Sequence, residues 1–317
     1  MTKEVLKFDI LILGGGPAGL GAGVYAARGA LKTAIIDTNM LGGQPTNFLE
    51  IENYIGFPLI GGYDLAEKFE EHADVFKVEK YSMQELVKVD LVSKTKVVET
   101  LEKIFEAKSV IIASGASPKK LEIKGEDKFY GRGVSYCAVC DGAFFKDKTI
   151  VVAGGGNTAV EEGIYLTRFA KKVYIVNHSD KLKADKILQD KLFANAKVEV
   201  IFNSQLEEII GEEKVTSVVV KNLENDEIST IATDGVFPFI GMSPNVKYYN
   251  GQLEQDKNGF IVTNANMQTS IDGVFAAGDI RTTPLRQVIT AVSDGAIAAV
   301  NAIKYVEELT ELVVAEN

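Results

Sequence analysis

Residues 8–19, FDILILGGGPAG, join a short apolar run to a glycine-rich turn. The apolar run predicts a buried parallel strand, and the small residues of 17–29 predict a helix directly after the turn. A second buried strand is expected over 33–37, TAIID. Strand, glycine turn, helix and strand in this order are typical of the dinucleotide-binding half of a Rossmann-like α/β domain.

Each glycine of this turn has a physical task. Gly14 permits the tight bend, Gly16 lets the backbone approach a pyrophosphate, and Gly19 lets the helix pack closely on the strand. The start of the helix favours the phosphate charge, and Asp37 can accept hydrogen bonds from a ribose hydroxyl. The alternative is a glycine turn without a ligand, which the neighbouring strand, helix and acid disfavour.

The same arrangement recurs later in the chain. TIVVA at 149–153 leads into GGGNTA at 154–159, followed by a helix expected over 158–170 and a strand over 173–176. Two nucleotide-binding domains are therefore predicted. The second strand runs into NHSDK at 177–181, which offers neither an acid at its start for a ribose 2′-hydroxyl nor an arginine pair for a 2′-phosphate. An empty or altered second nucleotide site is the alternative here.

The only cysteines are Cys137 and Cys140, two residues apart and followed by Asp141. Such a pair can close a readily exchanged disulfide, and the Asp141 carboxyl could move protons to or from a thiolate. The alternatives are a buried reduced pair or half of a metal site. With His72 and His178 as the only histidines, the spacing fits no usual zinc pattern, so no metal is expected.

Composition narrows the class of protein further. The chain has 317 residues and a formal net charge of −10, which disfavours nucleic acid and anionic membranes as partners. Its longest uncharged stretch, 10–27, holds too many glycines for a spanning helix, and the residues before it do not resemble a basic leader. A cytoplasmic protein is expected. The segment 198–234 alternates weakly and predicts antiparallel hairpins.

Taken together, these motifs resemble the low-molecular-weight, bacterial-type thioredoxin reductases, and the resemblance runs nearly end to end. No single motif identifies the family, but their order along the chain is highly specific. The matching pieces are GGGPAG at 14–19, GGQ at 42–44, ENY at 52–54, CAVCDG at 137–142, GGGNTAVEE at 154–162, AGD at 277–279 and RQ at 286–287.

The resemblance implies an α/β fold with two Rossmann-like, three-layer nucleotide-binding domains, the second inserted in the first. The FAD-binding domain would be discontinuous, comprising 1–117 and 246–317. The inserted pyridine-nucleotide domain, 118–245, would carry the cysteines. Turn-forming residues cluster near both seams, at 117–118 and 243–245.

The resemblance also implies residue roles. FAD would be held by residues from four parts of the chain: Gly14, Gly16, Pro17, Ala18 and Gly19; Asp37, Gly42, Gly43 and Gln44; Asn53; and Gly278, Asp279, Arg286, Gln287 and Val288. The pyridine nucleotide would lie against Gly154, Gly156, Asn157 and Thr158. Cys140 would lie nearer the flavin, Cys137 would attack the thioredoxin disulfide, and Asp141 would be the general acid/base. A homodimer is implied as well.

One departure concerns the electron donor. Family members that use NADPH carry His-Arg-Arg and a further Arg after the second strand, where this chain has Asn177-His178-Ser179 and Lys183. Each lost arginine–phosphate contact is worth about 1.5–3 kcal/mol. A strict NADPH preference is therefore not expected, and the donor stays open between NADH and NADPH. The alternatives are ferredoxin or another low-potential donor with the same disulfide chemistry, and a non-enzymatic flavin redox sensor.

Overall fold

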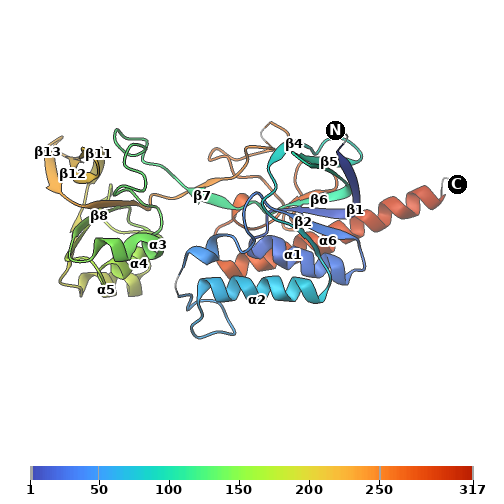
Figure 1. The fold of residues 1–317 in the computed structure, drawn as a ribbon, viewed down its shortest axis with the longest axis horizontal. Helices are drawn as coiled ribbons and strands as arrows, with labels where there is room; N and C mark the ends of the chain where they lie inside the picture. Colours follow the sequence, from blue (N-terminus) through green and yellow to red (C-terminus); the bar gives the residue numbers. More distant parts are fainter. Residues whose placement is uncertain (1–2, 49, 250, 316–317) are drawn as a thin grey trace. The chain divides into compact units, whose positions relative to one another are not determined.

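A computed structural model describes residues 3–48, 50–249 and 251–315, with the side chains of Cys140 and of 312–315 outside the description. The chain divides into two compact units, Met1–Ser117 with Ser243–Asn317 and Pro118–Met242 (Figure 1). The two crossings, β7 (Ala116–Pro118) and β15 (Met242–Pro244), pair with each other. The return crossing lies three residues before the expected seam at 245/246, because β15 pairs with β7 there.

The first unit is built on a sheet whose strand order is β3-β2-β1-β6-β5-β4, with β16 also paired to β6. Strands β1, β2, β3, β6 and β16 are parallel, whereas β4 and β5 run antiparallel to β6 and each other. Their bounds are β1 Glu4–Leu13, β2 Thr33–Ile36, β3 Glu79–Tyr81, β4 Leu86–Asp90, β5 Lys96–Thr100, β6 Lys103–Ile112 and β16 Val274–Ala276.

Three helices, α1 (Pro17–Arg28), α2 (Gly62–Val75) and α6 (Val288–Ala315), cover one face of this sheet (Figure 1). Alternation along β1 sends Ile10 and Ile12 to the helices and Leu11 and Leu13 to a second core on the opposite face. Helices α1 and α6 approach closely, because a Cβ on Gly295 would overlap the carbonyl oxygen of Ala18. The predicted strand-turn-helix-strand unit is confirmed, whereas sequence analysis did not predict α2.

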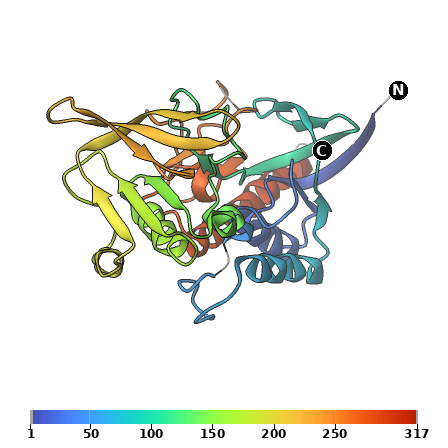
Figure 2. The same cartoon turned by 60° about the vertical axis from the view of Figure 1, so that its left-hand side comes forward.

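The second unit has a parallel sheet of order β10-β9-β8-β14 and a separate antiparallel sheet of order β11-β12-β13 (Figure 2). The parallel strands are β8 Thr149–Ala153, β9 Lys172–Val176, β10 Val198–Ile201 and β14 Gly235–Pro238. The antiparallel ones are β11 Ser204–Gly211, β12 Val215–Asn222 and β13 Ile228–Ala232. Its helices are α3 Ala138–Asp141, α4 Asn157–Leu166 and α5 Lys186–Phe193, and it has one short 3-10 helix, η2 Gly142–Phe145. The first unit has two short 3-10 helices, η1 Gln44–Asn47 and η3 Gly278–Ile280.

Two expectations for this unit were wrong in detail. The hairpins predicted over 198–234 begin only at β11, since β10 pairs in parallel with β9. The helix predicted to reach residue 170 ends at Leu166, where the Thr167 hydroxyl donates back to the Ile164 carbonyl. The two Rossmann-like halves themselves are present as predicted.

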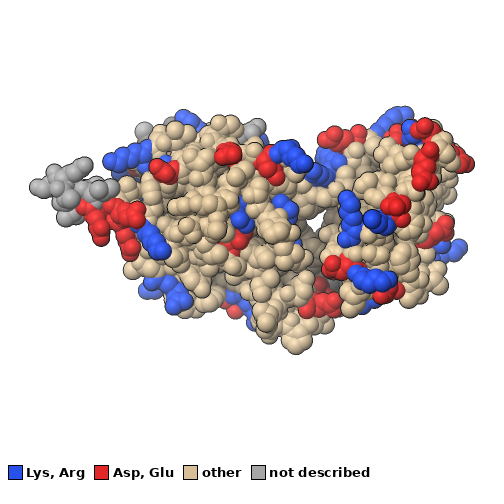
Figure 3. All heavy atoms as spheres, turned by 180° about the vertical axis from the view of Figure 1, so that it is seen from behind, with Lys and Arg blue, Asp and Glu red and all other residues tan. Residues whose placement is uncertain are grey.

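Charged side chains of both signs are interspersed on the face seen in Figure 3, where no field of one sign dominates. Many form exposed pairs, such as Lys120 with Asp127. Across the described residues, no helix combines the length and the apolar character needed to span a membrane.

Candidate functional site

The turn between β1 and α1 requires glycine at two positions. Gly14 has φ +113°, and a Cβ there would collide with the carbonyl of Ala113, the residue that directly follows β6. A Cβ on Gly19 would collide with the carbonyl of Gly14, so the helix lies directly against the turn. Gly16 is the N-cap of α1 in extended backbone. Pro17 and Ala18 begin the helix and are buried.

Asp37 fixes this turn from the end of β2. Its Oδ2 accepts a hydrogen bond from the Gly15 N–H at 2.6 Å, and its Oδ1 accepts one from the Asn39 N–H at 2.8 Å. Burial raises the pKa of Asp37, and hydrogen bonds from the backbone of Gly15, Asn39 and Thr38 oppose that rise. The carboxylate therefore orders the glycine turn in addition to offering its remaining lone pairs to a ribose.

The loop at 42–44 lies beside the same turn. The Gly42 N–H donates to the Gly15 carbonyl at 2.8 Å, and Gly43, with φ +64°, brings its backbone next to Gly16. Gln44 holds the loop to the chain beyond β6 by donating from Nε2 to the Ala116 carbonyl at 3.1 Å. Backbone rather than side chains thus lines the approach to Gly16.

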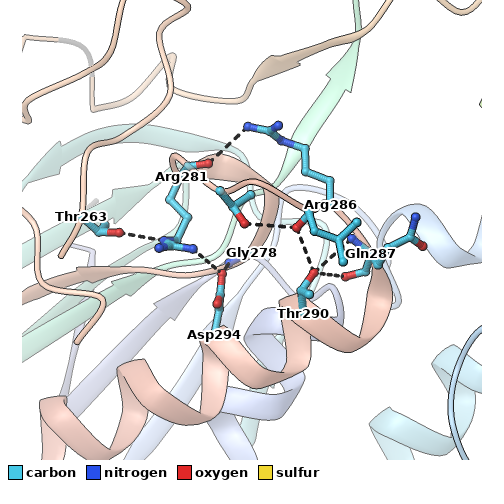
Figure 4. A network of polar contacts seen from close by, with 9 residues as sticks. Thr263, Gly278, Arg281, Arg286, Gln287, Thr290 and Asp294 are labelled. Atoms are coloured by element: carbon cyan, nitrogen blue, oxygen red, sulfur yellow. Dashed lines mark hydrogen bonds and ion pairs between the residues drawn. The ribbon is translucent and has the colours of Figure 1, made fainter. Parts of the chain in front are cut away.

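A network between η3 and α6 completes the site in this unit (Figure 4). Asp294 Oδ2 accepts from the Gly278 N–H at 3.2 Å and pairs with Arg281 Nη1 at 3.0 Å. Arg281 in turn donates from Nε to Thr263 Oγ1 at 2.7 Å. The Arg281 and Asp294 side chains are only 11% and 12% exposed. This buried pair, which sequence analysis missed, holds the Gly278-Asp279 turn.

Asp279 lies in that turn, and no described residue donates a hydrogen bond to its carboxylate. Burial raises its pKa, while the charge of Arg286 lowers it and that of Asp294 raises it. The Arg286 guanidinium stacks 4.0 Å from the Phe260 ring centre, with Nη2 3.4 Å from the Arg281 carbonyl (Figure 4). A partly buried carboxylate to which no described residue donates is suited to a ligand hydroxyl.

Residues distant in sequence meet at the start of α6. Asn53 donates from Nδ2 to Gln287 Oε1 at 3.1 Å, and Val288 is the first residue of α6. The first unit therefore combines a helix N-terminus with free N–H groups, an acid at Asp37 and an unpartnered acid at Asp279. These features fit FAD, whose pyrophosphate, ribose and ribityl hydroxyls need such partners.

The second glycine turn is more open. Gly154 has φ +132°, and a Cβ there would collide with the Phe239 carbonyl, yet a Cβ on Gly156 would have no atom within 4 Å. Asn157 is tied to α5 by two hydrogen bonds with Asp185, at 2.9 and 2.7 Å, and Thr158 is exposed. The open face at Gly156 fits the pyrophosphate of a pyridine dinucleotide.

Asn177, at the end of β9, is 2% exposed. Its Nδ2 donates to the carbonyls of Ser179 and Lys181 at 2.9 and 3.0 Å. The amide nitrogen therefore folds the following loop, and its two N–H groups are not free to bind a ribose. The exposed side chains of that loop are His178, Asp180, Lys181 and Lys183.

Cys137 is disulfide-bonded, and Cys140, the only other cysteine in the sequence, has its side chain outside the described residues. The Cys137 carbonyl accepts from the Asp141 N–H at 3.2 Å, and Cys137 immediately precedes the short helix α3. Helix α3 packs against α4, where Glu162 is buried. No group of three His, Cys, Asp or Glu side chains able to hold a metal occurs in the described ranges.

The comparisons with known proteins agree with this geometry. The family described as pyridine nucleotide-disulphide oxidoreductase matches residues 8–295. The chain is 48% identical over 312 residues to the thioredoxin reductase of Bacillus subtilis (strain 168), covering 98% of each protein. It is 46% identical over 317 residues to that of Listeria innocua serovar 6a, covering 100% of this chain and 99% of the relative.

Solved structures give the same result. The crystal structure of Lactococcus lactis thioredoxin reductase matches with a TM-score of 0.92 and 42% identity, covering 95% of this chain and 99% of that one. The thioredoxin reductase of T. acidophilum matches with a TM-score of 0.88 and 35% identity, covering 94% and 98%. Both the sequence and the fold are thus shared over nearly the whole chain.

Proposed function

Since this chain belongs to the thioredoxin reductases of the pyridine nucleotide-disulphide oxidoreductase family, we propose that it is an FAD-dependent thioredoxin-disulfide reductase. Electrons pass from a pyridine nucleotide to the cysteine pair and then to the disulfide of thioredoxin. One observation carries the proposal: Cys137 is disulfide-bonded at the head of α3, in a unit that has its own open nucleotide turn.

In the first unit, bound FAD supplies the two-electron relay between a hydride donor and a disulfide. The turn at Gly14–Gly19 receives its pyrophosphate at the start of α1. Asp37 would accept from a ribose hydroxyl, and Asp279 would accept from a hydroxyl of the ribityl chain. The Arg281–Asp294 pair keeps Gly278 in place, so the chain orients the cofactor mainly through backbone and two carboxylates.

In the second unit, the cysteines perform the exchange. Reduction breaks the Cys137–Cys140 bond and leaves two thiols. The Cys137 thiol gives its proton to Asp141, and the resulting thiolate attacks one sulfur of the thioredoxin disulfide. The other thioredoxin sulfur leaves as a thiolate that takes this proton from Asp141. Cys140 then attacks Cys137 in the mixed disulfide, which restores the enzyme disulfide and releases the second thioredoxin sulfur. That sulfur takes up the proton that Cys140 loses.

The donor is a nicotinamide dinucleotide bound at Gly154, Gly156, Asn157 and Thr158. The open face at Gly156 supports this, since a Cβ there would have no atom within 4 Å and a phosphate has room to approach the backbone. Without an arginine in 177–183, lysines are left as the cations that could meet a 2′-phosphate, as point charges rather than bidentate forks. We propose that the enzyme accepts NADH as well as NADPH.

Anaerobic stopped-flow mixing tests this scheme. NADH and NADPH should each bleach the flavin absorbance of wild type, and oxidised thioredoxin should restore it. Cys137→Ser should still be bleached by the nucleotide but should not reduce thioredoxin. If reduced ferredoxin bleached the flavin and neither nucleotide did, the donor would be ferredoxin and not a pyridine nucleotide. Bleaching of the flavin without reduction of thioredoxin would favour a redox sensor.

The family resemblance further supports a homodimer located in the cytoplasm, where reduced pyridine nucleotides are generated. Light scattering of the FAD-loaded protein measures the oligomeric state directly. A mass near that of one chain, 34.4 kDa, would contradict the dimer.

A further inference from the structure

A buried carboxylate fixes the segment that leads into Cys137. Glu126 is 3% exposed. Its Oε1 accepts from the Leu121 N–H at 2.8 Å, and its Oε2 accepts from the Glu122 N–H at 2.7 Å. A third hydrogen bond comes from the Tyr136 hydroxyl to Oε1 at 2.6 Å. The carboxylate therefore ties the residue directly before Cys137 to a turn that precedes it in the chain.

The Tyr136 hydroxyl is a dependable donor in this bond. Burial raises the pKa of Tyr136, and the Glu126 carboxylate raises it further, so the phenol keeps its proton throughout the physiological range. A hydrogen bond from a neutral donor to a charged acceptor is stronger than one between neutral groups. Losing it would free the Tyr136 side chain and leave Glu126 with two donors instead of three.

The backbone of Cys137 is held from the other side by Ser135. The Ser135 N–H donates to the Val236 carbonyl on β14 at 3.0 Å, which anchors it to the parallel sheet. Its Oγ lies 3.1 Å from the Cys137 nitrogen, which donates to it, and 3.2 Å from the Cys137 carbonyl. Cys137 thus lies between a strand end and the Glu126 turn.

We propose that the hydrogen bond from Tyr136 to Glu126 is a positioning contact that keeps Cys137 where its disulfide can close. This rests on the proposed function for the redox role of Cys137. In the reduced protein, a Cys137 thiol that is held near Cys140 has a high effective concentration for closing the disulfide. A Cys137 thiol that moves more freely has a lower effective concentration. Weakening the contact should therefore favour the dithiol and make it a weaker reductant.

The chain offers a matched control. Tyr130 stacks beside Tyr136 with ring centres 5.9 Å apart, but it is 66% exposed, and its hydroxyl has no hydrogen-bond partner within the described part of the chain. Tyr136→Phe and Tyr130→Phe remove the same atom a few ångströms apart. Only the first removes the contact to Glu126.

The experiment equilibrates FAD-loaded protein with glutathione redox buffers, traps thiols by alkylation and reads the dithiol fraction by mass spectrometry. Tyr136→Phe should shift the disulfide equilibrium three- to tenfold toward the dithiol, or about 15–30 mV. Tyr130→Phe should shift it less than twofold. Equal shifts in the two variants, or none in Tyr136→Phe, would overturn the proposal.

A double-mutant cycle adds an independent test. Glu126→Gln alone should shift the equilibrium in the same direction, and adding Tyr136→Phe should then change it less than twofold. Full additivity would mean that the two side chains act separately and would refute the contact. Because glutathione replaces thioredoxin and nucleotide, these outcomes do not depend on the physiological reaction. Failure of wild type to reduce thioredoxin would instead refute the proposed function alone.

Discussion

Glu162 supports a prediction about how stability depends on pH. The side chain is 7% exposed on α4, and its Oε2 has no hydrogen-bond partner in the part of the chain that the structure describes. Burial raises its pKa from 4.5 to about 7, with a smaller contribution from the charge of Glu161. The raised pKa means that Glu162 binds its proton roughly 300-fold more tightly in the folded protein than in the unfolded chain, a difference of about 3 kcal/mol.

The sign follows from linkage. Between pH 4.5 and 7 the folded protein keeps the Glu162 proton while the unfolded chain has lost it, so the free energy of unfolding falls as pH rises through this range. Glu162→Gln cannot ionise and removes this dependence. The variant should gain up to about 3 kcal/mol over wild type between pH 4.5 and pH 8.

Far-UV circular dichroism in urea measures the effect at a series of pH values, since the chain has no tryptophan. Glu161→Gln is the control, because the neighbouring Glu161 side chain is exposed and makes the smaller contribution to the pKa of Glu162. Its curve should keep most of the wild-type fall in stability with rising pH. Parallel stability curves for wild type and Glu162→Gln from pH 4.5 to 8 would show that Glu162 is ionised in the folded state and would refute the reasoning.

Three further predictions concern the two nucleotide turns. Asp37→Ala removes the acceptor of two backbone hydrogen bonds, each worth about 1.5–3 kcal/mol to a charged group. It should weaken FAD binding at least tenfold in a fluorescence titration of apoprotein. Unchanged affinity for FAD would contradict the role of Asp37. Arg281→Met leaves Asp294 as an uncompensated buried charge and should lower the free energy of unfolding in urea by about 3–5 kcal/mol. Bound FAD should be lost as well. Lys120→Met, which breaks an exposed pair, should change neither stability nor bound FAD. Gly156→Ala meets no neighbour, so stability should stay within about 0.5 kcal/mol while the calorimetric Kd for NADH rises; an unchanged Kd would mean that the dinucleotide does not approach this backbone.

Much of the fold was predictable because its signals are local. The apolar runs before Gly14 and Gly154 and the small residues after them lie within single stretches of sequence, and both became strand-turn-helix units. The pairing partner of 198–201 was not predictable, because a short, weakly alternating strand carries no sign of whether its neighbour runs parallel or antiparallel. In the structure, the helix α5 connects β9 to β10, and such a helical crossover joins strands that run parallel.

The supporting contacts of the site were hidden for a different reason. Arg281 and Asp294 are ordinary charges in sequence, and they matter because folding buries them together beneath Gly278. Glu126 and Tyr136 likewise meet only after the intervening loop folds back. A charged residue in an otherwise apolar helix face, such as Asp294 within α6, is the one sequence signal that could have marked such a position.

The two glycine turns differ most at one equivalent position. Asp37 and Asn177 both end the second strand of their half, but a carboxylate accepts from the Gly15 N–H and keeps free lone pairs, whereas the amide of Asn177 spends both donors on the carbonyls of its own loop. The strand end of the second turn therefore offers a ribose no carboxylate. The choice between a 2′-hydroxyl and a 2′-phosphate then depends on the exposed loop, where the available cations are lysines. Point charges that bind a phosphate without bidentate geometry discriminate weakly, which is the physical reason to expect a tolerant donor site.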